Sequence, residues 1–67
     1  MSLSVTVNGN RRAIAEPALA VLVDELTGGR PGVAVAVNDA VVPRADWDGF
    51  QLHENDRIEV LHAVQGG

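Results

Sequence analysis

The start of the chain alternates between apolar and polar side chains. Over residues 3–7 the odd-numbered positions are apolar and the even-numbered positions are polar, and this period of two is typical of a half-buried strand. Asn8-Gly9 follows directly, a pair that favours the tight turn of a β-hairpin. We therefore expect a hairpin whose return strand covers residues 11–15, with Ile14 facing the interior.

The next segment has the spacing of an amphipathic helix. Its apolar residues recur three and four positions apart, which places them on one helix face: Leu19, Leu22, Val23 and Leu26. Pro17 suits the first turn of that helix, where its missing N–H would have no partner. Thr27-Gly28-Gly29 marks the end, because glycine accepts the left-handed conformation that follows a helix C-terminus.

The second half of the chain predicts three further strands. Residues 33–37 alternate valine with alanine and fit a central strand, which Asn38-Asp39 ends with a turn. Val41-Val42 fits a short strand that ends at Pro43, since proline cannot donate to a sheet. Residues 57–63 fit the last strand.

The segment between the last two strands, residues 44–52, has no regular period. A short helical turn near residues 45–48 is expected, and Trp47, Phe50 and Leu52 are expected to cover the core.

The order hairpin, helix, strand, short strand, irregular segment and strand indicates an α+β fold. One main helix would pack across one face of a mixed sheet of four or five strands. That face takes the odd-numbered valines of the first and third strands, together with Ile58 and Val60 of the last strand. Glu59 and Leu61 would then point away from the helix.

The composition and length of the chain mainly exclude certain kinds of chemistry. The 67 residues suffice for one small domain, and there is no cysteine to form a disulfide, a nucleophilic thiol or a metal site. A chain of this length has little room for both a core and a concave pocket of the usual ~300–1,000 Å³. We therefore expect a carrier, a binding module or a subunit rather than an enzyme.

The net charge of −4 disfavours nucleic acid and anionic membrane surfaces as partners. The first residues show neither the basic region nor the apolar run of a signal peptide, and no apolar run approaches the ~20 residues of a membrane span. A cytoplasmic location is the expectation. His53 and His62 are weak candidates for a metal site, because they lack cysteine or a clear carboxylate partner.

Gly66-Gly67 is the feature with chemical specificity. Two glycines end a chain by chance with odds of about 0.5%, from the average glycine usage, although a frayed terminus is the alternative reading. Residues 64–67 can extend at most ~14 Å beyond the sheet, and two glycines can thread a narrow groove. The Gly67 carboxylate would need activation by a nucleotide, and the chain has no phosphate-binding loop of its own, so the activating enzyme must be a partner.

Two stretches of the sequence form a recognisable pattern. One is Val35-Ala36-Val37-Asn38 with Val41-Val42-Pro43-Arg44 and Trp47, and the other is Leu52 and Asn55-Asp56-Arg57-Ile58-Glu59-Val60 with the ending Ala63-Val64-Gln65-Gly66-Gly67. In these stretches the chain resembles the ThiS family, the ubiquitin-like β-grasp sulfur carriers of thiamine (thiazole) biosynthesis. Val5-Thr6-Val7-Asn8-Gly9 also fits the opening hairpin of that family, so the resemblance covers essentially the whole chain.

This resemblance implies a mechanism and a set of partners. A ThiF-like adenylyltransferase would use ATP and Mg²⁺ to adenylate the Gly67 carboxylate, and this chain would bind no cofactor itself. Sulfur from a cysteine desulfurase or another persulfide donor would convert the adenylate to a thiocarboxylate. Thiazole synthase would then take that sulfur into the thiazole ring.

The resemblance also implies how partners hold the chain. Residues 1–63 would form the β-grasp domain and residues 64–67 a flexible tail, in which Val64, Gln65 and Gly66 line the partner's channel. Ubiquitin-like proteins dock through an apolar patch on the open sheet face. The expected docking residues here are Leu61, Ala34 and Ala36.

Three other functions are compatible with the same sequence. The small subunit of molybdopterin synthase resembles this fold and tail, but that family is generally longer. A protein modifier would be joined to target lysines through Gly67. A non-covalent β-grasp binding module would keep its function without Gly66 and Gly67.

Overall fold

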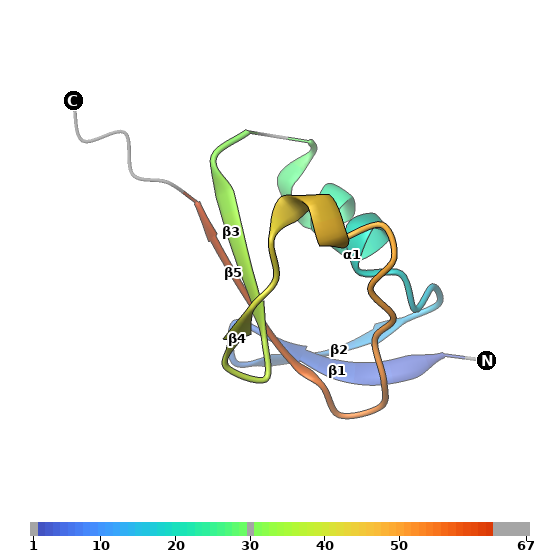
Figure 1. The fold of residues 1–67 in the computed structure, drawn as a ribbon. Helices are drawn as coiled ribbons and strands as arrows, with labels where there is room; N and C mark the ends of the chain where they lie inside the picture. Colours follow the sequence, from blue (N-terminus) through green and yellow to red (C-terminus); the bar gives the residue numbers. More distant parts are fainter. Residues whose placement is uncertain (1, 30, 63–67) are drawn as a thin grey trace.

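The computed structural model describes residues 2–29 and 31–62. Within that part of the chain, five strands form one sheet and a single α-helix lies across one of its faces (Figure 1). In chain order the elements are β1 (Leu3–Val7), β2 (Asn10–Ile14), α1 (Leu19–Thr27), β3 (Val33–Val37), β4 (Ala40–Val41), the 3-10 helix η1 (Arg44–Asp46) and β5 (Arg57–His62).

The sheet is mixed, with the strand order β2-β1-β5-β3-β4. The central strand β5 runs parallel to its neighbour β1, and the other neighbouring strands pair antiparallel. The parallel pair needs a long connection between its strands, and here α1, β3, β4 and η1 all lie within it. The expected α+β fold, with five strands in the sheet, is confirmed.

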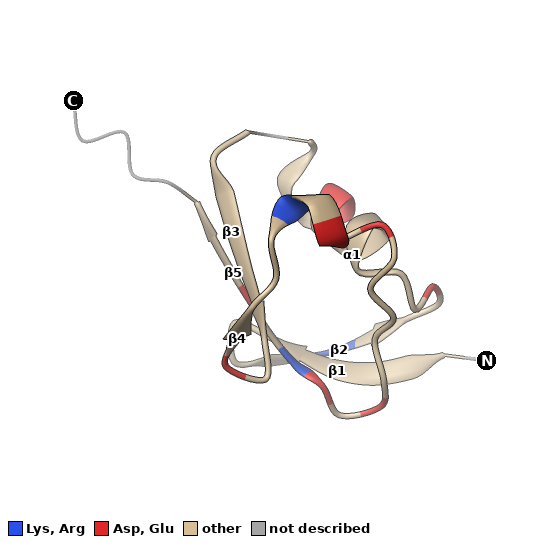
Figure 2. Ribbon diagram, viewed as in Figure 1, with Lys and Arg blue, Asp and Glu red and all other residues tan. Residues whose placement is uncertain are grey.

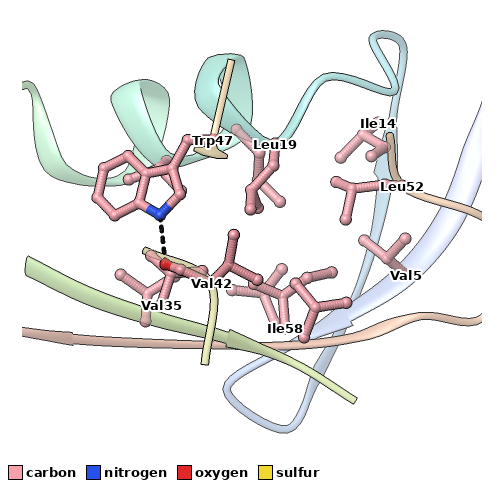
Figure 3. Close-up of a cluster of buried hydrophobic side chains, with 13 residues drawn as sticks. Val5, Ile14, Leu19, Val35, Val42, Trp47, Leu52 and Ile58 are labelled. Atoms are coloured by element: carbon pink, nitrogen blue, oxygen red, sulfur yellow. Dashed lines mark hydrogen bonds between the residues drawn. The ribbon is translucent and has the colours of Figure 1, made fainter. Parts of the chain in front are cut away.

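Alternating side chains place the core between the sheet and α1 (Figure 3). The interior takes the valines of β1 and β3, the even-numbered residues of β5 and three residues of the helix face: Val5, Val7, Val35, Val37, Ile58, Val60, Leu19, Leu22 and Val23 are all buried. Leu26 is half-buried against them. The predicted inward faces of these strands and of the helix are therefore correct, and so is the inward position of Ile14.

The helix begins two residues later than Pro17, so the prediction of proline in its first turn is wrong. Ala18 is extended (φ −73°, ψ 124°) and pairs with Gln51 in an isolated bridge. The Pro17 carbonyl accepts the Leu52 backbone N–H at 2.7 Å. This pairing with the returning chain keeps Pro17 out of the helix.

The end of α1 is as predicted. Gly28 adopts the left-handed conformation (φ 66°), and its N–H donates to the Asp24 carbonyl at 2.8 Å. The buried Thr27 hydroxyl donates to the Val23 carbonyl at 2.8 Å. The first contact satisfies one of the carbonyl groups that the end of a helix leaves without partners, and the second gives the buried Thr27 hydroxyl an acceptor.

The short strand β4 lies one residue earlier than the predicted strand Val41-Val42. The Val42 N–H donates to the Val35 carbonyl at 2.9 Å, and the Val42 side chain is buried. The Trp47 indole N–H donates to the Val42 carbonyl at 2.8 Å (Figure 3). Trp47 and Leu52 are buried and Phe50 packs against the core, so all three cover it as predicted.

Candidate functional site

The strand that leads to the predicted tail lies inside the sheet. β5 is flanked by β1 on one side and β3 on the other, and His62 at its end pairs with Val33 at the start of β3. The predicted tail residues Val64, Gln65, Gly66 and Gly67 lie outside the described residues, as does Ala63. The candidate site within the described residues is therefore the surface beside the C-terminal end of β5.

The structure brings the three predicted docking residues together on the sheet face opposite α1. Leu61 pairs directly with Ala34 across the two strands, and its side chain is 65% exposed. Ala34 is exposed and Ala36 is half-buried. Their positions alternate with buried residues of the same strands, so all three point away from the helix.

A fourth residue of this surface, Val41, was not predicted. It pairs with Ala36 in the antiparallel β3·β4 ladder and is 76% exposed. The available signal was the strict alternation of sides: because Val42 packs inward, its neighbour Val41 must face the side of Ala36. We refer to Ala34, Ala36, Val41 and Leu61 as the apolar patch.

Charged side chains border the apolar patch without entering it. β3 carries no charge along its length (Figure 2), while the exposed Glu59 pairs with Ala36 from β5. Arg57 lies further from the end of β5 and forms an ion pair with Asp39 at 2.9 Å. Both side chains of that pair are largely exposed, so it adds only ~0–1 kcal/mol to stability.

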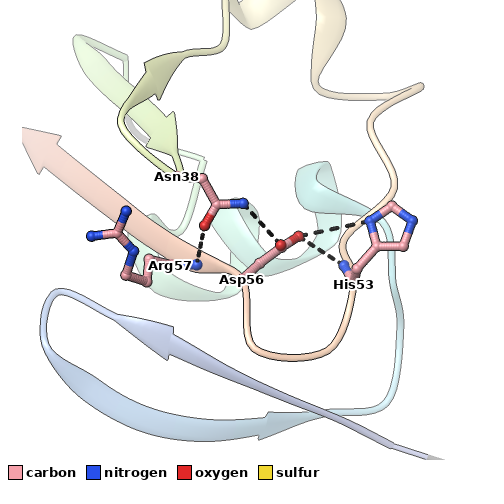
Figure 4. Close-up of polar contacts among 4 residues, drawn as sticks. All are labelled: Asn38, His53, Asp56 and Arg57. Carbon is pink, nitrogen blue, oxygen red and sulfur yellow. Dashed lines mark hydrogen bonds and ion pairs between the residues drawn. The ribbon is translucent and has the colours of Figure 1, made fainter.

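A polar network fixes the beginning of β5 (Figure 4). The Asn38 Oδ1 accepts the Arg57 backbone N–H at 2.9 Å, and the Asn38 amide donates to Asp56 Oδ1 at 3.0 Å. The other Asp56 oxygen accepts the His53 backbone N–H at 2.8 Å. The His53 ring lies 3.9 Å from the same carboxylate, so this histidine belongs to a turn that precedes the strand.

Apart from the apolar patch, the surface of the described residues has small hollows. One of about 260 Å³ lies between α1 and η1 and is lined by Asp24, Asp48 and the Arg44–Trp47 pair, in which the guanidinium lies 5.7 Å from the ring centre. This volume is below the ~300–1,000 Å³ of small-molecule sites. Within residues 2–29 and 31–62, no three metal-ligating side chains gather in one place.

The described helices include none with the length and apolar character needed to span a membrane.

Comparisons with known proteins agree with this geometry. The family model described as "ThiS family" matches residues 5–67. Among solved structures, the chain is similar to the crystal structure of a thiamine biosynthesis protein (ThiS) from Geobacter metallireducens, with a TM-score of 0.76 and 23% identity over 97% of this chain and 100% of that one. The architecture is thus the ubiquitin-like β-grasp fold. No curated protein sequence matches the chain.

Proposed function

The chain belongs to the ThiS family, and we propose that it is a sulfur carrier in thiamine biosynthesis that works through its C-terminal glycine. The observation that carries this proposal is the reach of the family match, which extends to residue 67 and so includes Gly66-Gly67. The fold adds support, since its central strand β5 leads directly toward that end of the chain.

The proposed chemistry converts the Gly67 carboxylate to a thiocarboxylate in three steps. The carboxylate attacks the α-phosphate of ATP on a ThiF-like adenylyltransferase, pyrophosphate leaves, and an acyl adenylate forms. A persulfide supplied by a cysteine desulfurase or a similar donor then attacks the acyl carbon and AMP leaves. Reduction of the resulting S–S bond by a thiol gives a terminal thiocarboxylate, from which thiazole synthase takes the sulfur.

In this scheme the chain is a protein substrate, and the nucleotide and Mg²⁺ are held by the partner. Gly66 and Gly67 carry no Cβ, so the partner's channel can close around the bare backbone. Val64 and Gln65 are the proposed contacts at the mouth of that channel.

The apolar patch is the proposed docking surface. Leu61 is the residue of the patch nearest to the tail in sequence, six residues before Gly67. A partner that covers Leu61, Val41 and the two alanines removes their apolar surface from water. This favours binding by about 25 cal/mol per Å² before the costs of association are subtracted. The same contact would bring the last residues of the chain to the partner's active site.

The experiment that tests this function is adenylation of the purified chain by a ThiF-like enzyme, followed as pyrophosphate released from ATP. We expect Gly67→Ala to lower the rate at least tenfold, because a Cβ enters a channel shaped for none. The matched control is Gly49→Ala, since a Cβ at Gly49 meets nothing within 4 Å. Full activity of Gly67→Ala, or an equal loss in both variants, would contradict the role of the terminal glycine.

A further inference from the structure

The pairing between β1 and β5 ends at Asn8. The parallel register joins Thr6 to Arg57 and Val7 to Ile58, and the Asn8 backbone N–H still donates to the Ile58 carbonyl at 2.9 Å. Beyond this point the chain of β1 turns away into the hairpin, whereas β5 continues to His62. The backbone N–H and carbonyl of Val60 therefore point toward the β1 side at a position where β1 has no backbone groups left to pair with them.

The side chain of Asn8 takes the place of the missing backbone. Its Oδ1 accepts the Val60 N–H at 2.8 Å, and its Nδ2 donates to the Val60 carbonyl at 3.1 Å. A side-chain amide carries the same carbonyl and N–H groups as a peptide, and in this orientation each meets its complement. Both hydrogen bonds are partly buried, so without Asn8 two polar groups of Val60 would lose their partners.

The turn makes this geometry possible. Asn8 has φ 50° and Gly9 has φ 85°, and two successive positive values are the signature of the turn that Asn-Gly favours. Asparagine thus satisfies two demands at one position, since it tolerates the left-handed conformation and supplies both a donor and an acceptor. Aspartate would place a carboxylate against the Val60 carbonyl.

We propose that Asn8 is a positioning residue for the chemistry of the chain's end, because it holds β5 at Val60 and so fixes the position in which Leu61 meets the partner. This inference rests on the proposed function. In the described part of the chain, β3 supports β5 as far as His62, and Asn8 supplies the support furthest along β5 from the β1 side. Loss of the Asn8 amide would let the end of the strand pivot about its pairing with β3.

Asn38 provides a matched control within the same molecule. It also follows a strand with a positive φ (52°), and its Oδ1 also accepts a β5 backbone N–H, that of Arg57. Arg57 lies at the opposite end of β5 from the tail. Asn38→Gly thus removes an equivalent amide contact while leaving the exit of the strand untouched.

The test compares Asn8→Gly with Asn38→Gly, because glycine keeps the positive φ of each turn and removes only the amide. In the free protein, we expect Asn8→Gly to speed hydrogen exchange at the Val60 amide about tenfold, the effect of one lost hydrogen bond. With the adenylating enzyme, KM should rise about tenfold at nearly constant kcat, since binding must then order the strand end. Asn38→Gly should keep KM within about twofold, as expected when no contact near the tail is lost.

Unchanged exchange at Val60 in Asn8→Gly, or equal KM increases in both folded variants, would overturn the proposal and leave Asn8 a purely structural residue. If Asn8→Gly does not fold, the wild-type chain decides: its Val60 amide must exchange as slowly as that of Ile58, and fast exchange overturns the contact. A wild-type chain that the adenylating enzyme does not accept overturns the proposed function and the role of Asn8 in activation together.

Discussion

Leu61 and Val41 are large apolar side chains that the fold leaves in solvent, at 65% and 76% exposure. A single exposed leucine needs no explanation. Here two such residues share one face with Ala34 and Ala36, next to a strand that bears no charge. Exposed apolar residues that gather in this way are typical of surfaces that bind other proteins.

A charge on the apolar patch tests that role. We expect Leu61→Arg to raise the Kd for the adenylating enzyme about tenfold or more, since it places a charge in an apolar contact. The free energy of unfolding should change by less than about 0.5 kcal/mol, because Leu61 is exposed. Binding can be measured by calorimetry.

The control for this variant is Val21→Arg, which adds the same charge to an exposed apolar residue on α1, across the sheet from the patch. It should bind the enzyme as the wild type does. Equal affinity of Leu61→Arg and the wild type would remove the patch from the docking surface.

Trp47 tests how the irregular segment is held. Trp47→Phe keeps an aromatic ring but removes the indole N–H that donates to the Val42 carbonyl. Leaving a buried carbonyl without its partner costs about 1–3 kcal/mol, and we expect the free energy of unfolding in urea to fall by that amount. A loss below about 0.5 kcal/mol would show that this contact adds little beyond the packing of the ring.

At the scale of elements, alternation and helical spacing predicted what local residues decide. The inward faces of β1, β3 and β5 follow from their period of two, and the end of α1 follows from Gly28. The start of α1 could not be predicted in this way. Ala18 is extended because it pairs with Gln51, a residue far along the chain. The residues around Ala18 give no sign of such a long-range contact.

The end of α1 gives a prediction at this scale. Gly28→Ala forces a Cβ onto a residue with φ 66°, which should lower the free energy of unfolding by about 1 kcal/mol. A Cβ there meets nothing within 4 Å, so the loss would come from the backbone alone. The control Gly49→Ala has the same open surroundings, and a loss of equal size in both variants would contradict this explanation.

At the scale of the whole molecule, the candidate site was only partly predictable. Strand alternation placed Leu61, Ala34 and Ala36 on the open face, and the family resemblance gave them a docking role. The place of Val41 beside them also required the pairing of β4 with β3. The contact of Asn8 with Val60 joins residues 52 positions apart in the sequence. The turn was predicted from Asn-Gly. The hydrogen bonds of the Asn8 side chain to Val60 could not be predicted in this way, because they depend on the parallel pairing of β1 with β5.

The fold thus places a small, mainly aliphatic core behind a sheet whose open face carries the apolar patch and whose central strand leads toward the C-terminal end of the chain. The core accounts for stability, and the patch and the tail account for the proposed function. In the proposed carrier role, the chemistry takes place at the last residue of the chain rather than in a pocket in its body.

The most direct test of that central claim is the intact mass of the chain after incubation with a ThiF-like enzyme, ATP, a persulfide donor and a thiol that reduces the intermediate S–S bond. We predict an increase equal to the mass of one sulfur atom minus one oxygen atom, lost again when thiazole synthase and its other substrates are added. The increase should be absent when ATP is omitted. An unchanged mass with an enzyme that modifies its own carrier, or a modification located away from Gly67, would contradict the account.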